Sequence, residues 1–386
     1  MKPTIRTLAA LPIVLPALMA GLFVAGSSAQ AVTEIGGQKI VTLTRTATSK
    51  TTPEFTSITL APGRGMELIQ VTANFPGKGN VDVLASPDLA GAKKMLDDQD
   101  DANGDLGYRL GAAFLVPYPN RIIGKLSPDG QTLTTEWEGH TLTLPANNAG
   151  KDPGAERHAM HGLILKAKTD DVHVKDIPGG KEVTGVIHAG DFGGHWLSKT
   201  DLDYTIALTA NAIDVSIVAH NVGKAAEPIA IGWHPYFNLP SGDRAQARLH
   251  IPGSMLAVVN NYDSVFPTGK LVPVTGQYDL RAPNGEPFAD HYYDDNWSHL
   301  TWKDGVVTVK VIDPAAHYGV KIEGISPQIK TIQAYSPPTA KFVAVEDQYN
   351  FADPFGKEWG KMDTGMVTLH PGQSTKWHVR LKVFVP

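Results

Sequence analysis

Apolar and polar side chains alternate along most of this chain with a period of two residues. That period is typical of β-strands with one buried and one solvent-facing side. The clearest case is the C-terminal segment, where Thr375, Trp377, Val379, Leu381 and Val383 alternate with charged and polar residues. The pattern predicts a long strand at the end of the chain.

The same alternation predicts two β-hairpins. Segments 204–208 and 213–217 flank a short turn around Asn211, and segments 306–312 and 318–322 flank a turn that contains Asp313 and Pro314. Shorter strands are predicted at 132–137, 141–144 and 249–251.

Glycine and proline fall between these runs, as turn residues do, and they are numerous, with 38 glycines and 28 prolines. One short helix is predicted at 89–96, before an acidic loop over 97–105, and no internal repeat or linker interrupts the chain. We therefore expect an all-β protein, a large antiparallel β-sandwich that forms a single domain over residues 32–386.

The first 31 residues have the features of an export signal. Lys2 and Arg6 precede an apolar stretch over 8–24, and Ala29–Ala31 offers a small-x-small cleavage pattern. An uncleaved membrane anchor is the alternative, although two prolines within the apolar stretch count against it. We expect a periplasmic or secreted protein with no membrane attachment after signal removal.

The net charge and the lack of cysteine limit which classes of partner and which cross-links the protein can have. The chain has a formal net charge of −5, and residues 1–31 hold two basic and no acidic residues, so their removal gives −7. An acidic surface argues against nucleic acid as a partner. The absence of cysteine excludes disulfides, and the chain is long enough to bury a large core as a monomer or homodimer.

Two candidate polar sites lie in the first half of the chain. Asn120 and Arg121 follow two prolines at a strand end, where a guanidinium can donate forked hydrogen bonds to hydroxyls or a carboxylate. His161 precedes Gly162, which permits close approach of backbone or ligand. A turn-closing surface arginine and a structural histidine are the alternatives, and His158 competes with His161.

Segment 231–239 places aromatic and hydrogen-bonding side chains close together. Alternation places His234, Tyr236 and Asn238 on one face of a strand, with the larger apolar side chains toward the other. An imidazole, a phenol and an amide in one row suit a sugar site, which needs hydrogen bonds and apolar stacking surfaces. Core packing of the aromatic residues, with His234 capping a turn, is the alternative.

Glu346 follows the apolar segment 341–345, so we expect a partly desolvated carboxylate with a raised pKa. An edge-strand charge facing water is the alternative. A carboxylate, two histidines and several amides suit proton transfer on a hydroxyl-rich molecule, with a base and an acid facing each other across it. No Gly-rich dinucleotide motif, Gly-x-Ser-x-Gly or His-Glu-x-x-His accompanies them. His291, beside three aspartates, could bind a cation only by accident.

Together these motifs resemble those of the aldose 1-epimerases, the galactose mutarotase family, from about residue 65 to residue 384. The matching elements are Asn120–Arg121, His161–Gly162, the His-x-Tyr-Phe-Asn-Leu run from His234 and the Glu-x-Gln run from Glu346. Two weaker matches are segment 293–297, which contains Asp294, and segment 332–335, which contains Gln333.

The resemblance implies a galactose mutarotase-like supersandwich and an isomerase that interconverts the α and β anomers of a free hexose of the glucose or galactose type. Glu346 would be the general base and His234 the general acid, with no cofactor and no metal. The substrate-binding residues that it implies are Asn120, Arg121, His161, Tyr236, Asp294 and Gln333.

The sequence also departs from the family pattern. Leu163 replaces a usual second glycine, Asp295 is expected to add negative charge near the sugar, and Trp233 and Pro235 are expected to narrow the pocket.

An exported carbohydrate-binding protein on the same sandwich, without catalysis, is the main alternative function. A sugar-phosphate epimerase would need several basic residues near the pocket, of which Arg121 is the evident one. A lyase or hydrolase would need a second carboxylate beside Glu346, and Asp294 is the one candidate.

Overall fold

The computed structural model describes residues 31–386, and Val32–Pro386 forms one compact unit. The export signal expected over residues 1–31 falls, apart from Ala31, outside the described residues. Within the described part, no helix is long and apolar enough to cross a membrane.

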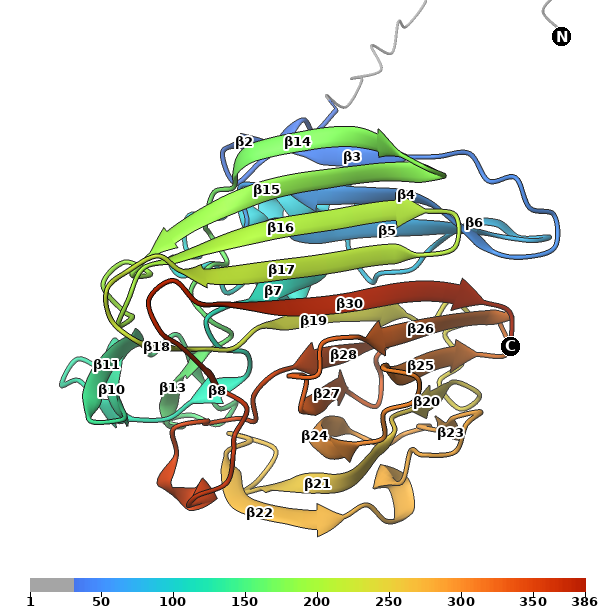
Figure 1. Ribbon diagram of the computed structural model, residues 1–386. Helices are drawn as coiled ribbons and strands as arrows, with labels where there is room; N and C mark the ends of the chain where they lie inside the picture. Colours follow the sequence, from blue (N-terminus) through green and yellow to red (C-terminus); the bar gives the residue numbers. More distant parts are fainter. Residues whose placement is uncertain (1–30) are drawn as a thin grey trace, which may run out of the picture. The chain divides into compact units, whose positions relative to one another are not determined.

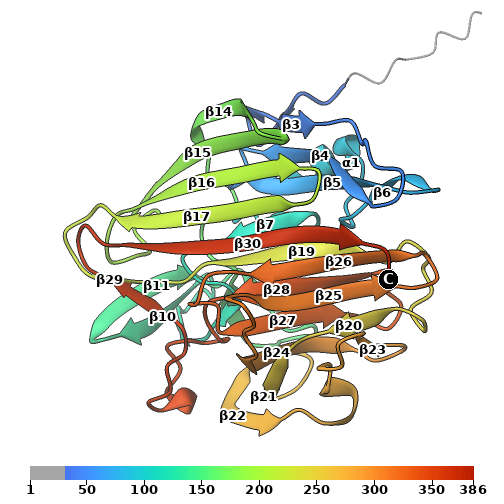
Figure 2. The same cartoon turned by 45° about the vertical axis from the view of Figure 1, so that its right-hand side comes forward.

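Two large antiparallel sheets pack face to face (Figures 1 and 2). The first has nine strands, in the order β14 (Asp170–Ile177), β15 (Gly180–Gly190), β16 (Thr200–Thr209), β17 (Ile213–Asn221), β30 (Ser374–Phe384), β26 (Tyr318–Gly324), β25 (Val307–Asp313), β20 (Arg248–His250) and β23 (Glu286–Pro287). The second has eleven, in the order β22 (Pro267–Pro273), β21 (Gly253–Val259), β24 (Tyr293–Leu300), β27 (Thr331–Ser336), β28 (Phe342–Gln348), β19 (Gly232–Asn238), β7 (Ala112–Leu115), β5 (Glu67–Phe75), β4 (Glu54–Ala61) and β3 (Val41–Thr44), with β6 (Gly79–Asp82) beside β5.

Smaller sheets and helical turns complete the fold. The short strands are β1 (Glu34–Ile35), β2 (Gln38–Lys39), β8 (Arg121–Ile122), β9 (Lys125–Leu126), β10 (Thr132–Trp137), β11 (His140–Pro145), β12 (Asn148–Ala149), β13 (Arg157–Met160), β18 (Glu227–Ile229) and β29 (Val367–Leu369). The helical elements are α1 (Leu89–Leu96) and the 3-10 turns Gly107–Arg109, Gly276–Tyr278 and Lys357–Trp359.

The all-β prediction is confirmed, and the strands lie where alternation placed them. The first predicted hairpin is the pair β16–β17 and the second is β25–β26. The helix expected at 89–96 is α1, whose N-terminus is capped by the Asp88 carboxylate accepting from the Gly91 N–H at 2.8 Å. Strand β30 buries Trp377, Val379 and Leu381 on its inner face.

Aromatic side chains from both sheets fill the space between them. Phe114 of β7 lies 5.4 Å from Tyr204 of β16 and 6.3 Å from Trp377 of β30, between ring centroids. Trp233 of β19 lies 6.2 Å from Trp377 and is fully buried. Because Trp233 points into this core, its strand neighbour His234 must point to the opposite face of the second sheet.

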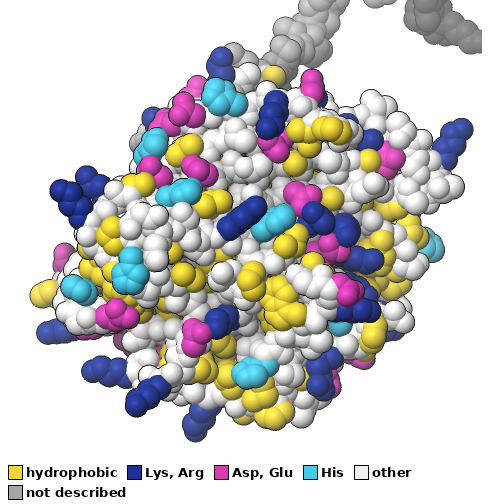
Figure 3. Space-filling model, in the orientation of Figure 1, with side chains coloured by type: hydrophobic (Ala, Val, Ile, Leu, Met, Phe, Trp, Pro, Cys, Tyr) yellow, Lys and Arg dark blue, Asp and Glu magenta, His cyan; other side chains and the backbone are white. Residues whose placement is uncertain are grey.

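The outer face of the nine-stranded sheet is polar. Histidines and aspartates on neighbouring strands pair there, such as His188 with Asp201 at 2.9 Å and His220 with Asp203 at 3.0 Å. The view in Figure 3 accordingly shows charged side chains mixed with apolar ones. The large apolar side chains that are exposed lie scattered along the sequence.

Asp347 is an exception to the apolar core. Its carboxyl lies between the sheets, 1 % exposed, and neither oxygen has a hydrogen-bond partner within residues 31–386. Burial raises the pKa of Asp347 from 3.8 to about 7. The folded state therefore holds a proton on this carboxyl that the unfolded chain releases above about pH 4.

We expect the Asp347→Asn variant to unfold with a weaker pH dependence than the wild type. The contribution of Asp347 to stability is fully present below pH 3.8 and is lost as the pH rises toward 7, by up to about 4 kcal/mol. Urea unfolding at pH 5 and pH 8 measures this loss. Glu227, whose pKa burial also raises to about 7, leaves a residual slope. An unchanged pH dependence in the variant would contradict the buried, proton-binding carboxyl.

Candidate active site

A cavity of about 410 Å³ lies on the face of the second sheet that turns away from the core. All eight predicted site residues line it, namely Asn120, Arg121, His161, His234, Tyr236, Asp294, Gln333 and Glu346. They come from segments that are up to 226 positions apart along the chain, and the fold brings them together on adjacent strands and the loops above them.

Strand register explains how this set assembles. Antiparallel pairing places Asn296 of β24 opposite Gln333 of β27, and Gln333 opposite Glu346 of β28. Strand β19 then pairs with β28 through Tyr236 and Ala344, and the same register continued by two residues sets His234 opposite Glu346. Because paired residues point to one side of a sheet, these side chains form a row across four strands.

His234 and Glu346 are in direct contact. The Nε2 atom of His234 lies 3.2 Å from the Oε1 atom of Glu346, and the Gln348 amide donates to the other carboxylate oxygen at 2.6 Å. The expectation that base and acid face each other across the sugar is therefore wrong. Neighbouring positions on paired strands keep them adjacent, and adjacent groups suffice because the ring oxygen and the anomeric hydroxyl share one carbon.

Burial controls the charge of this pair. It raises the pKa of Glu346 well above its usual range and lowers the pKa of His234 to about 4. Both shifts favour the uncharged form of each group, and with both groups uncharged the pair holds a single proton. A proton that can lie on either side of a 3.2 Å contact gives the pair one acid and one base at once.

Glu346 lies within β28 rather than at its end, because the strand continues to Gln348. Alternation places Glu346 and Gln348 on the pocket face and Asp347 in the core. The expectation of partial burial is therefore too weak, since the Glu346 side chain is 1 % exposed.

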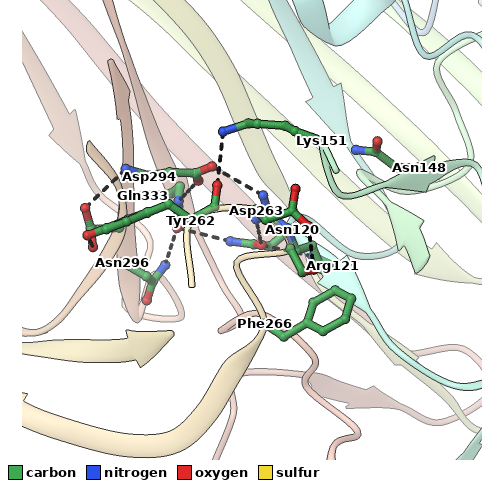
Figure 4. Close-up of polar contacts among 12 residues, drawn as sticks. Asn120, Arg121, Asn148, Lys151, Tyr262, Asp263, Phe266, Asp294, Asn296 and Gln333 are labelled. Carbon is green, nitrogen blue, oxygen red and sulfur yellow. Dashed lines mark hydrogen bonds and ion pairs between the residues drawn. The ribbon is translucent and has the colours of Figure 1, made fainter. Parts of the chain in front are cut away.

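A second polar network lies beside the pair in the cavity (Figure 4). The Gln333 amide donates to Asp294 at 2.9 Å, and Asp294 also accepts from the Arg121 guanidinium at 3.4 Å. The Asn120 amide donates to the Gln333 oxygen at 3.2 Å, and its own oxygen accepts from Arg121 at 3.0 Å. These four side chains fix one another, which prepares their remaining donors for a ligand.

His161 lies above the row, next to His234, with ring centroids 4.9 Å apart. Its backbone has a φ of 60°, and Gly162 follows with a φ of 78°. A Cβ atom at position 162 would lie 2.4 Å from the Val116 carbonyl oxygen, so glycine is required there by backbone packing. Burial and the neighbouring His234 lower the pKa of His161 well below its usual range.

Several buried polar atoms at the cavity have no partner within the described chain. They are Nε2 of His158, Nδ1 of His161, Nδ1 of His234 and Nε of Arg121, so both histidines that the sequence offered at 158 and 161 line the cavity. Buried polar atoms are normally hydrogen-bonded, so a bound molecule or water is their natural partner. Hydroxyl groups, which both donate and accept, fit such a mixed set.

One side-chain cluster in the described part of the chain could hold a metal ion. Ligand atoms of His161, His234 and Glu346 all lie within 4.8 Å of one another. Two imidazoles and a carboxylate form a set that zinc can bind. Motif spacing could not reveal this cluster, because its members come from separate elements.

Two expected departures from the family pattern have no effect at the cavity. Asp295 points away from it, where its carboxylate accepts from the Tyr262 hydroxyl at 2.7 Å. The expectation of extra negative charge near the sugar is therefore wrong, since adjacent strand residues face opposite sides. Trp233 packs in the core, and neither it nor Pro235 lines the cavity, so these residues do not narrow the pocket.

Sequence reasoning missed several side chains of this site. Tyr108 packs against both histidines with tilted rings, 4.7 Å from His161 and 6.1 Å from His234 between ring centroids. Arg109, at the end of a 3-10 turn, and Lys151, in a loop, also line the cavity, and no periodic pattern marks them. The role of Gln348 could have been inferred, because a spacing of two on a strand places it beside Glu346.

Comparisons with known proteins identify the family and the fold of the chain. The model of the family described as aldose 1-epimerase matches residues 91–382, which is most of the chain. No curated protein matches the sequence of this chain. A galactose mutarotase-like protein from Clostridium acetobutylicum is 19 % identical, with a TM-score of 0.69 over 86 % of this chain and 93 % of that one.

Two further solved structures share the fold. A GalM/aldose epimerase homologue from C. elegans is 18 % identical, with a TM-score of 0.65 over 89 % of this chain and 99 % of that one. A galactose 1-epimerase from Lactobacillus acidophilus is 13 % identical, with a TM-score of 0.60 over 90 % and 99 %. The match of the family model over residues 91–382 shows that the chain belongs to the aldose 1-epimerase family.

Proposed function

We propose that this protein is an aldose 1-epimerase that interconverts the α and β anomers of a free hexose by opening and reclosing the ring. The observation that carries the proposal is the buried contact between His234 Nε2 and Glu346 Oε1 at 3.2 Å, on the floor of a cavity lined with hydroxyl-binding groups. Family membership and fold support the same reaction type.

Ring opening needs one proton removed and one supplied. Ionised Glu346 takes the proton of the anomeric hydroxyl, the bond from C1 to the ring oxygen breaks, and protonated His234 gives its proton to that oxygen. The product is the open-chain aldehyde, with carboxyl and imidazole both neutral. After rotation about the C1–C2 bond, the hydroxyl attacks the other face of the aldehyde, and the two residues return the protons.

The remaining side chains would hold the sugar while its first carbon rotates. Arg121, Asp294 and Gln333 are fixed by mutual hydrogen bonds and can bind ring hydroxyls without reorganising. His161, with Nδ1 unpartnered within the described chain, can bind at the reacting end. General acid and base catalysis by positioned groups contributes about 10²–10⁴-fold.

We expect kcat/KM to follow a bell-shaped pH profile, because the pair is active only when it holds one proton. Protonation of His234, with a pKa of about 4, removes the base and gives the acidic limb. Loss of the shared proton removes the acid and gives the alkaline limb, which the raised pKa of Glu346 moves to higher pH. Rates measured across this range, after subtraction of the uncatalysed reaction, test the expectation. A monotonic rise toward acid would contradict it.

Polarimetry on freshly dissolved α-D-glucose and α-D-galactose tests the proposed function. The expected result is faster decay to the equilibrium rotation in proportion to protein concentration. If glucose, galactose, xylose and arabinose all decay at the spontaneous rate although calorimetry detects binding, the chain is a carbohydrate-binding protein on this sandwich. The epimerase assignment would then be withdrawn.

We also propose that the domain over residues 32–386 is exported after removal of residues 1–31. The charge, the apolar stretch and the small-x-small pattern of the N-terminus support this. Fractionation of producing cells and N-terminal sequencing of the protein test it, with Val32 as the expected first residue. Recovery of the uncleaved chain with the membrane would contradict it.

A further inference from the structure

Two cationic side chains lie at the cavity that holds the acid–base pair. Arg109 is exposed at the end of a 3-10 turn, with its guanidinium carbon 6.0 Å from the Tyr108 ring centroid. The Lys151 ammonium donates to the Tyr262 carbonyl oxygen at 3.1 Å and to the Tyr292 hydroxyl at 2.8 Å (Figure 4). Within residues 31–386, neither cation forms an ion pair with a carboxylate.

The carboxylates of the cavity are already engaged. Asp294 pairs with Arg121 at 3.4 Å, and Glu346 lies 3.2 Å from His234. Asp263 accepts a backbone N–H at 2.7 Å and remains the one carboxylate of the lining without a cationic or imidazole partner. The lining of the cavity thus holds two cations and one carboxylate outside these pairs, in a chain whose net charge is −5.

Arg109 lies close to the ring that packs against His234. The Tyr108 ring centroid lies 6.1 Å from the His234 ring centroid and 6.0 Å from the Arg109 guanidinium carbon. Arg109 and the general acid are therefore neighbours of the same tyrosine ring. A sugar whose anomeric end meets His234 would direct its far end toward this cation.

Tyr335 lines the same cavity as both cations. Burial raises the pKa of this phenol, and the charges of Lys151 and Arg109 oppose that rise. Tyr335 and Phe342 add aromatic surface at the same side of the cavity, with ring centroids 6.4 Å apart. The cavity thus combines aromatic faces with two cations.

We propose that the substrate is an aldose that carries an anionic group, a carboxylate or a phosphate, at the end remote from the anomeric carbon, and that Arg109 and Lys151 bind this group. The inference rests on the proposed function of the same site. Guanidinium groups bind carboxylate and phosphate through two parallel hydrogen bonds, and hydrogen bonds between charged groups are stronger than neutral ones. Neutral aldoses would then be slower substrates.

Binding and catalysis are measured separately to test this. Calorimetry on the Glu346→Gln variant compares D-galacturonate with D-galactose, and D-glucose 6-phosphate with D-glucose, without turnover. Anomer exchange by the wild type is followed for the same four sugars. We expect the anionic sugar of one pair to bind and react about 10- to 100-fold better than its neutral counterpart. A preference confined to galacturonate identifies the carboxylate, and one confined to glucose 6-phosphate identifies the phosphate.

The double variant Arg109→Gln, Lys151→Gln is expected to bring this ratio close to one. The matched control Lys199→Gln removes an exposed positive charge outside the cavity and should leave the ratio unchanged. Equal binding of anionic and neutral sugars, or a ratio that survives the double variant, overturns the inference. If no sugar is turned over while the binding ratio behaves as expected, the proposed function fails and the inferred anion site stands.

Discussion

Replacing Glu346 by glutamine is expected to lower kcat/KM for anomer interconversion by about 10²–10⁴-fold. Glutamine has the shape of glutamate and can still accept the hydrogen bond from Gln348, so the cavity should persist. It cannot take a proton from the anomeric hydroxyl, which leaves the reaction without its base. The rate of decay of optical rotation, with the spontaneous rate subtracted, measures the loss.

The matched control for this variant is Glu227→Gln. Glu227 is also fully buried with a raised pKa, but its carboxylate accepts from Thr200 and lies outside the cavity. This control should keep the activity of the wild type. An equal loss in both variants would show that removal of any buried carboxyl impairs the protein, and the assignment of Glu346 as base would fail.

The second large effect is expected for His234→Asn, which should also lower kcat/KM by about 10²–10⁴-fold. Asparagine can fill part of the space and donate to Glu346, but it has no proton to transfer to the ring oxygen. Because the pair acts as one unit with one proton, the double variant of both positions should be hardly less active than either single one. Rates of the two single variants and the double variant measure this coupling.

His250→Asn serves as the control for this position. His250 is a half-buried histidine on β20, hydrogen-bonded to the Leu280 carbonyl at 3.1 Å and absent from the cavity. It should retain full activity. Losses that multiply in the double variant of His234 and Glu346 would contradict the shared-proton account, because independent groups contribute independently.

The strands could be predicted from sequence because burial acts on each residue locally. Every second side chain of β30 faces the core, and that leaves a period of two which needs no knowledge of the rest of the fold. The turn residues and the Asp88 cap mark the element ends in the same local way. The order of strands within the two sheets leaves no pattern in the local sequence. For example, β19 lies between β28 and β7 because it pairs with segments far away along the chain.

Motif order identified the family and with it the eight residues that the fold brings to one cavity. Distances between them were not predictable, because the contact of His234 with Glu346 depends on the pairing of β19 with β28. Loop residues such as Arg109 and Lys151 could not be found either. They follow no period, and what places them at the cavity is the packing of loops over a sheet.

The orientation of Asp295 illustrates a further limit. A carboxylate next to the substrate-binding candidate Asp294 suggested added charge at the sugar, but strand alternation turns it away and Tyr262 binds it. Alternation was available from the sequence and would have given the correct side. A family motif shows that Asp295 is next to Asp294 in sequence, but it does not show that the two side chains lie on opposite faces of the strand.

The central claim is that the pair of Glu346 and His234 opens and recloses an aldose ring. Saturation-transfer NMR at anomeric equilibrium tests it most directly, because it observes exchange between the α and β anomeric protons of one sugar. In D₂O, the account predicts exchange accelerated by the wild type, no acceleration by Glu346→Gln, and no deuterium at C1 or C2. Undiminished exchange with the variant, or deuterium at C2, would contradict it.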